Sequence, residues 1–137
     1  MFMMALKLPL EADIMTTTQN IITVLLSIFF VFASSIKLLG WQKTIFTTQL
    51  AFFVKYGLNR NWMFVVGGVE LISALLIMTP ILMGGSIAVS ASLVGATALA
   101  VVSIGAIACH LWFDTWRDGV PAMVTLVLSA MLLLQRL

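Results

Sequence analysis

The sequence predicts an all-α integral membrane protein, a four-helix bundle with an amphipathic interfacial helix between the first and second crossings. The chain has 137 residues, of which 62% are hydrophobic and 9% are charged, whereas a soluble domain averages about 25% charged residues. Its apolar stretches approach the roughly 20 residues that a bilayer crossing needs. A single transmembrane domain of at most about four crossings fits this length, which excludes a two-domain enzyme or a many-helix transporter built from one copy.

Four apolar runs are predicted as crossings, at about residues 18–39, 62–79, 84–109 and 120–134. The first follows a threonine cluster at residues 16–18 that we expect to cap the helix start; the competing interpretation is a cleaved signal ending at Ala33. Pro80 is expected to stop the second crossing, because proline cannot continue the hydrogen-bond ladder. Pro121 suits the first turn of the fourth.

Residues 41–58 are too rich in polar side chains to cross. At helical spacing, Trp41, Phe52 and Tyr56 fall on one side, while Lys43 and Lys55 lie opposite. Two glutamines, at positions 42 and 49, interrupt the apolar arc. We therefore predict a helix that lies in the headgroup zone and forms a lid over the bundle.

Small and polar side chains predict how the crossings pack. Lipid gives helices no hydrophobic drive to associate, so close backbone approach depends on small residues. The third crossing has such residues at every fourth position, and the first has a polar stripe that we expect to face inward. The ladder is Gly84, Ala88, Ser92, Ala96 and Ala100, and the stripe is Thr23, Ser27, Ser34 and Lys37.

Glu70 is the most informative candidate, because it lies near the middle of the second crossing. At 1.5 Å per residue, about 13 Å of hydrocarbon separates it from water on either side. A lone carboxylate there must be protonated or find a partner. One interpretation is functional: Glu70 handles protons or anchors the polar head of a lipophilic ligand. The other is structural: Glu70 is an acid that bonds to Ser or Thr of a neighbouring helix.

Lys37 and His110 end the first and third crossings on the same side of the membrane as the lid. Lys37 differs from Glu70 by about 10 Å in depth, so we expect its stem to reach water, and a direct contact would need a tilt or a long inward reach. His110, the sole histidine, is a capping or interface residue or a proton-handling group. Asp114 and Arg117 are expected to form a weak surface pair, and Cys109 to be a small core residue.

Aromatic and basic residues gather on the side that carries the two longer connections. Trp41, Trp62 and Trp112 are candidates for ligand binding, with interfacial anchoring as the alternative for each. Five basic residues lie on this side and two, Lys7 and Arg136, on the other, so the positive-inside rule places the longer loops in the cytoplasm and both termini outside. Arg136 is expected at the membrane surface.

Several function classes have no supporting motif. One cysteine and one histidine do not make a self-sufficient metal, iron–sulfur or bis-histidine haem site, so we expect no metal or covalent cofactor. No block of like charges indicates a nucleic-acid partner, and no catalytic triad, phosphate loop or dinucleotide fingerprint occurs. We therefore name no catalytic residue.

Four segments together resemble the DoxX-like family of small four-helix membrane proteins: "FFVFASSIKLLG" (29–40), "YGLNRNW" (56–62), "GGVELISALLIMTP" (67–80) and "GAIACHL" (105–111). The resemblance implies a four-helix bundle in a bacterial inner membrane. For some relatives it implies association with quinone-linked sulfur oxidation or membrane redox complexes, and for others an assembly role. Lys37, Glu70 and His110 match the family's recurrent polar positions, whereas Ser34 and Ser35 stand where many members have glycine.

Two functions follow as hypotheses. In the first, the protein is a partner-dependent, redox-associated subunit that binds a quinone or lipid under the lid. Glu70 and His110 bond the polar head, Lys37 sets the local field, and a partner protein supplies electrons; any enzyme activity is then that of a subunit of a quinone-linked oxidoreductase. In the second, small-residue helix faces bind other membrane proteins as a scaffold or assembly factor. Membrane lipids and further copies of the chain are the other expected partners.

Overall fold

The computed structural model describes the backbone of residues 2–137 and the side chains from residue 16 onward. It is all-helical, as predicted. The five helices of the described chain are α1 (Phe2–Leu39), α2 (Lys43–Lys55), α3 (Arg60–Leu82), α4 (Ser86–Phe113) and α5 (Val120–Arg136). The short helix α2 takes the place of the predicted lid.

Within the part of the chain that the structure describes, three helical segments are long and apolar enough to cross a membrane: Thr16–Leu39 within α1, Arg60–Leu82 and Ser86–Phe113. The apolar helix α5 has 17 residues, about 25 Å at 1.5 Å per residue, slightly less than the roughly 30 Å hydrocarbon core. The protein is therefore an integral membrane protein with three to four apolar helices. Its orientation in the membrane stays a prediction.

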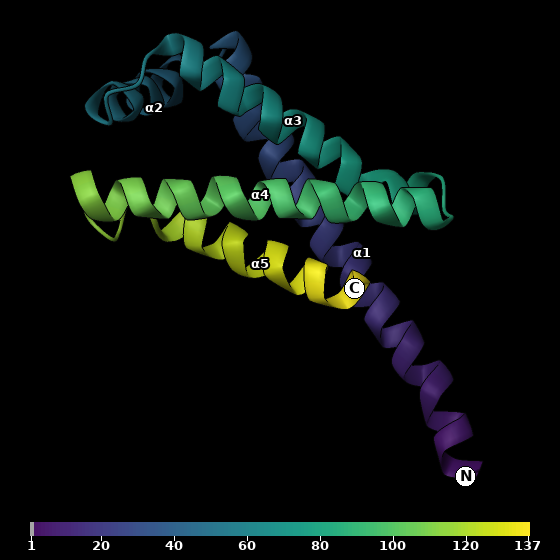
Figure 1. Cartoon of the computed structure of the whole chain (residues 1–137). Helices are drawn as coiled ribbons and strands as arrows, with labels where there is room; N and C mark the ends of the chain where they lie inside the picture. Colours follow the sequence, from purple (N-terminus) through teal and green to yellow (C-terminus); the bar gives the residue numbers. More distant parts are fainter. Residues whose placement is uncertain (1) are drawn as a thin grey trace.

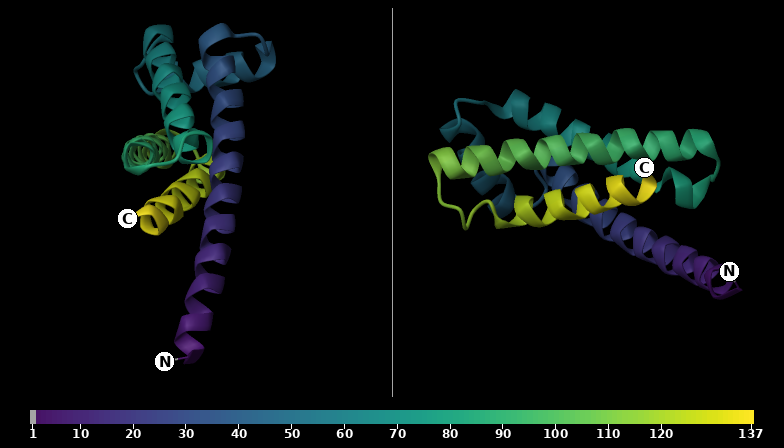
Figure 2. Two further views of the ribbon diagram at one scale, coloured as in Figure 1. Left: turned by 90° about the vertical axis from the view of Figure 1, so that its right-hand side faces the viewer. Right: turned by 60° about the horizontal axis from the view of Figure 1, so that its bottom comes forward.

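Helix α3 is central to the bundle, since it packs on both α1 and α4, while α5 packs on α4 and to a smaller extent on α1. Figure 1 shows α2 at the end of the bundle where α1 finishes and α3 begins. The right-hand view of Figure 2 shows α5 alongside α4, with α1 passing behind the pair. The end of the bundle that carries α2 is also the end where α1 and α3 are joined.

The small-residue ladder packs as predicted along α4. Ala88, Ser92 and Ala96 are buried in the bundle. A Cβ added to neighbouring Gly95 would lie 2.8 Å from the Ser73 carbonyl oxygen of α3, so the two backbones touch. Gly84, in contrast, lies in the turn before α4 with φ +71°. The polar stripe of α1 also faces inward, since Thr23, Ser27, Ser34 and Lys37 are all buried.

Two predicted helix boundaries are wrong. The threonines at 16–18 lie inside α1, which begins at Phe2, so they do not cap its start. Pro80 lies inside α3, which continues to Leu82. Proline leaves the carbonyl four residues earlier without its N–H partner, and the Thr79 hydroxyl lies 2.7 Å from that oxygen, on Leu76, as a replacement donor.

Arg136 does not end at the membrane surface as expected. Its guanidinium is half-buried and turns back into the bundle, where Nη2 donates to Thr23 Oγ1 at 2.8 Å and Nη1 donates to the Ile77 carbonyl at 3.1 Å. It also contacts the Ser92 hydroxyl. The side chain therefore links α5 to α1, α3 and α4, because buried polar groups on those helices need a donor.

Candidate functional site

Two capped helix starts position the elements around the site. The Gln42 side chain accepts a hydrogen bond from the Ile45 backbone N–H at 2.9 Å and so caps α2. Asn59 caps α3 in the same way through the Trp62 N–H, at 3.2 Å. Such caps satisfy backbone donors that have no partner in the helix. Gln42 thus precedes the apolar face of α2 as its N-terminal cap.

Lys37 and Glu70 form a buried ion pair between α1 and α3. Lys37 Nζ lies 3.0 Å from Glu70 Oε2, and the two residues are 8% and 4% exposed. The expectation that Lys37 would extend to water is therefore wrong. Gly67 gives the physical reason: a Cβ at that position would lie 2.9 Å from the Cβ of Lys37, so a glycine lets α1 come close enough for the lysine to reach inward.

The charge of the Glu70 carboxylate is compensated, but one of its oxygens has no hydrogen-bond donor. Although the Lys37 ammonium is within ion-pair distance of Oε2, Oε2 is buried and receives no hydrogen bond of normal geometry from the described residues. Attraction between charges depends on distance alone, whereas a hydrogen bond also depends on direction, so the ammonium neutralises the carboxylate without donating to this oxygen in normal geometry. Among the described residues the partner of Glu70 is Lys37, in place of the expected Ser or Thr hydroxyl.

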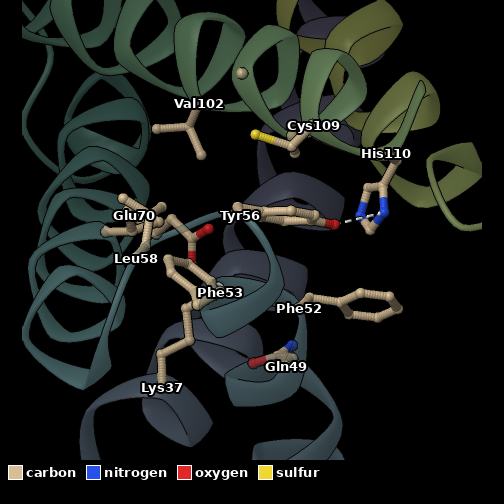
Figure 3. Close-up of a pocket in the computed structure, with 13 residues that line it drawn as sticks. Lys37, Gln49, Phe52, Phe53, Tyr56, Leu58, Glu70, Val102, Cys109 and His110 are labelled. Atoms are coloured by element: carbon tan, nitrogen blue, oxygen red, sulfur yellow. Dashed lines mark hydrogen bonds and ion pairs between the residues drawn. The ribbon is translucent and has the colours of Figure 1, made fainter. Parts of the chain in front are cut away.

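A cavity of about 360 Å³ opens beside this ion pair. Residues of α2, α3 and α4 form most of its wall, and the larger part of that wall is apolar, including Phe52, Phe53 and Val102. Figure 3 shows the Glu70 carboxylate pointing into the space between these side chains, with Gln49 and Tyr56 entering from α2. Oε1 of Gln49 is buried without a hydrogen-bond partner among the described residues. The cavity thus combines apolar walls with a few polar groups.

A hydrogen-bonded cluster adjoins the cavity at Tyr56 and His110, which line it. Tyr56 donates from its hydroxyl to Asp114 Oδ2 at 2.6 Å. His110 Nδ1 lies 2.9 Å from the Tyr56 oxygen and 3.1 Å from Asp114 Oδ2; because the tyrosine proton is directed at the carboxylate, we assign the Nδ1 proton to the histidine. Lys55 completes the cluster by contacting Asp114 Oδ1. The predicted surface pair of Asp114 with Arg117 is replaced by these contacts to α2.

The cluster determines the charge states of Tyr56 and Asp114. Burial acts to raise the pKa of the Asp114 carboxyl, but hydrogen bonds from Lys55, Tyr56 and His110 outweigh it and hold that pKa below its usual value. Burial and the neighbouring Asp114 carboxylate raise the pKa of the Tyr56 phenol far above its usual value. Tyr56 is therefore a neutral donor and Asp114 a charged acceptor at physiological pH.

The profile of the DoxX-like family matches residues 21–133, most of the chain. The protein belongs to the DoxX-like family. No curated protein and no solved structure gives a significant match. In this DoxX-like protein the three polar residues that carried the resemblance, Lys37, Glu70 and His110, all line the same cavity.

The tryptophans of this DoxX-like protein lie elsewhere. Trp41, Trp62 and Trp112 are 56%, 54% and 83% exposed, and none of them lines the cavity. Trp41 donates from Nε1 to the Ser35 hydroxyl at 3.0 Å. Their exposure agrees with interfacial anchoring, and ligand binding by these three residues stays a prediction without structural support.

Four residues at the site were not identified as candidates from the sequence: Gln49, Lys55, Tyr56 and Asp114. For Asp114 a signal was present, since His110 and Asp114 are four positions apart and such residues are neighbours on a helix surface. Gln49 was noted as a break in the apolar face of the lid, and its place in the cavity wall explains that break. Cys109, expected in the core, is half-buried and also lines the cavity.

Proposed function

We propose that this DoxX-like protein holds the polar head of a lipophilic molecule, such as a quinone or a lipid, in the cavity under α2, and acts as a partner-dependent, redox-associated membrane subunit. The observation that carries the proposal is the placement of a buried ion pair in the wall of an apolar cavity. Ionised groups inside a membrane domain are costly and characteristically functional.

The dimensions of the cavity support a small head group. Its volume of about 360 Å³ falls at the lower end of the range of about 300–1,000 Å³ for ligand pockets. Phe52 and Phe53 provide apolar contact area on the side of α2, while Glu70 and Gln49 supply polar atoms that can orient a guest. Such a combination of apolar walls and few directed polar groups is typical of ligand sites.

The ionisable groups also suit proton exchange with a bound head. Glu70 and His110 both line the cavity, and His110 is connected through Tyr56 and Asp114 to Lys55, whose side chain is 53% exposed. A bound head group would therefore have proton acceptors within reach on two sides. In this proposal the electrons come from a partner protein.

The test is mass spectrometry of the lipid extract from gently purified protein, comparing the wild type with Glu70→Gln. We expect a lipophile in stoichiometric amount with the wild type and its loss or strong reduction with Glu70→Gln. Trp112→Phe is the matched control, since that residue is exposed and lies outside the cavity. Equal retention by a folded Glu70→Gln protein would contradict the proposal.

The alternative, a scaffold that binds other membrane proteins through the small-residue face of α4, has less support. Ala88, Ser92 and Ala96 are 5%, 0% and 1% exposed, so this face is already packed within the chain. Bulky replacements there are expected to disrupt the bundle itself, and loss of a complex would then not identify a docking face.

A further inference from the structure

The cavity wall presents more hydrogen-bond acceptors than the protein satisfies. Glu70 Oε2 and Gln49 Oε1 are both buried with no hydrogen bond from the described residues, and both residues line the cavity. Buried polar atoms normally have a partner, and leaving one without a partner costs about 1–3 kcal/mol. Both oxygens of the Glu70 carboxylate are acceptors, whichever way the Gln49 amide is oriented.

Two donors beside the cavity, the Tyr56 hydroxyl and the His110 ring N–H, are already engaged with Asp114. The Tyr56 hydroxyl directs its proton at Asp114 at 2.6 Å, and His110 Nδ1 faces the same two oxygens. Neither proton is directed at Glu70 or Gln49. The nearest cation, Lys37, lies 3.0 Å from Glu70 Oε2 and neutralises its charge, but it does not provide a hydrogen bond of normal direction to that oxygen.

A guest that only accepts hydrogen bonds leaves this arrangement incomplete. A ketone, quinone or ester oxygen can accept from the Lys37 ammonium but cannot donate to Glu70. A hydroxyl group can do both, since it has one donor and two acceptor lone pairs. It would thus fill the carboxylate's unused capacity and accept from the lysine at the same time (Figure 3).

Resting on the proposed function, we propose that the cavity selects lipophiles whose polar head carries a hydroxyl donor, a phenol or an alcohol, over otherwise identical molecules that can only accept hydrogen bonds. For a redox-active ring this means that the reduced, dihydroxy form binds more tightly than the oxidised, dicarbonyl form. Glu70 is the selecting residue and Gln49 a second acceptor.

The expected preference follows from the hydrogen bond to the charged carboxylate. Such a bond contributes about 1.5–3 kcal/mol net, which corresponds to a ratio of dissociation constants of about 10 to 100. The measurement is the binding of matched probe pairs to the whole, detergent-solubilised protein by equilibrium dialysis. 4-Nonylphenol against 4-nonylanisole tests a ring-bearing head, and dodecanol against methyl dodecyl ether tests a lipid-like alcohol.

We expect the hydroxyl member of at least one pair to bind the wild type about tenfold or more tightly than its ether. The pair with the larger ratio of dissociation constants indicates whether the head group is a phenol on a ring or a lipid-like alcohol. Each ratio is compared with that of Glu70→Gln in the same detergent, which cancels the difference in micelle partitioning. With Glu70→Gln the ratio should fall severalfold. Gln49→Leu, on α2, where no residue is fully buried, provides a second variant that leaves the bundle core unchanged and should lower the ratio to a smaller extent. Trp112→Phe should leave the ratio unchanged.

The outcomes separate this inference from the function on which it rests. Equal affinity for alcohols and ethers in the wild type, or an undiminished ratio in folded Glu70→Gln, overturns the selection of donors while leaving ligand binding intact. Binding of none of the four probes, together with no lipophile in the purified protein, overturns both.

Discussion

Replacing Lys37 by methionine is the sharpest test of the buried ion pair. Methionine keeps a long apolar stem but removes the charge, so the Glu70 carboxylate would remain without a cation in an environment where it is 4% exposed. A surface pair contributes about 0–1 kcal/mol, whereas breaking a buried pair by removing one partner costs about 3–5 kcal/mol. With a 3.0 Å separation and both residues more than nine-tenths buried, the larger figure applies.

The assay is unfolding of the purified protein by sodium dodecyl sulfate at pH 7, followed by far-ultraviolet circular dichroism. We expect Lys37→Met to lower the free energy of unfolding by about 3–5 kcal/mol. The double variant with Glu70→Gln should recover part of this loss, because it removes the unpaired charge. Lys43→Met, at an exposed position of α2, is the control.

Two results would contradict the assignment of a buried, charged pair. A loss below about 1 kcal/mol for Lys37→Met would mean that the pair behaves as a solvated surface pair. A double variant no more stable than Lys37→Met alone would mean that the cost comes from lost packing and not from an unpaired carboxylate.

Three further changes test the architecture. Gly67→Ala should lower the free energy of unfolding by about 1–3 kcal/mol, since the added Cβ would meet α1 at 2.9 Å, whereas Gly68→Ala, which points into open space, should not; the same detergent titration measures both. Asp114→Asn should flatten the pH dependence of stability in the acid range. A carboxyl whose pKa is lowered on folding stabilises the fold above its pKa in the unfolded chain, about 4, and loses that contribution as pH falls through its lower pKa in the folded protein. A wild type that is no more sensitive to acid than the variant would contradict the cluster. Arg136→Gln should reduce thermal stability by about 1–3 kcal/mol because buried hydroxyl and carbonyl acceptors lose their donor, while Leu137→Ala, at an 87% exposed position, should not; equal melting temperatures would contradict the inward role of the guanidinium.

The apolar runs were sufficient to predict the helices but not their ends. Pro80 illustrates the difference, because its effect on α3 depends on whether another donor satisfies the freed carbonyl of Leu76, and the Thr79 hydroxyl lies in position to do so. The sequence contains this threonine, yet the direction of its hydroxyl is a property of the folded backbone. Helix interiors follow from hydropathy, whereas helix ends follow from single local hydrogen bonds.

The candidate site was predictable only in part, for two physical reasons. An estimate of membrane depth from the position of a residue in its helix treats the crossings as parallel rods, and it places Lys37 and Glu70 too far apart for contact. In the structure, α1 and α3 approach closely at Gly67, so the lysine side chain reaches the carboxylate. The sequence pairs Asp114 with its neighbour Arg117, whereas its partners in the structure, Lys55 at the end of α2 and Tyr56 directly after it, are 59 and 58 residues away. Contacts of such range depend on tertiary packing that periodicity does not contain.

The attachment of α2 bears on how a guest would enter. No residue of α2 is fully buried, so the helix contributes little apolar packing to the bundle and is held at its end by hydrogen bonds and an ion pair to Asp114. Segments with few buried contacts open at lower free energy than core helices. The same helix supplies Phe52, Phe53 and Gln49 to the cavity wall. A displacement of α2 would therefore open the cavity while leaving the Lys37–Glu70 pair, which belongs to α1 and α3, in place to receive a polar head.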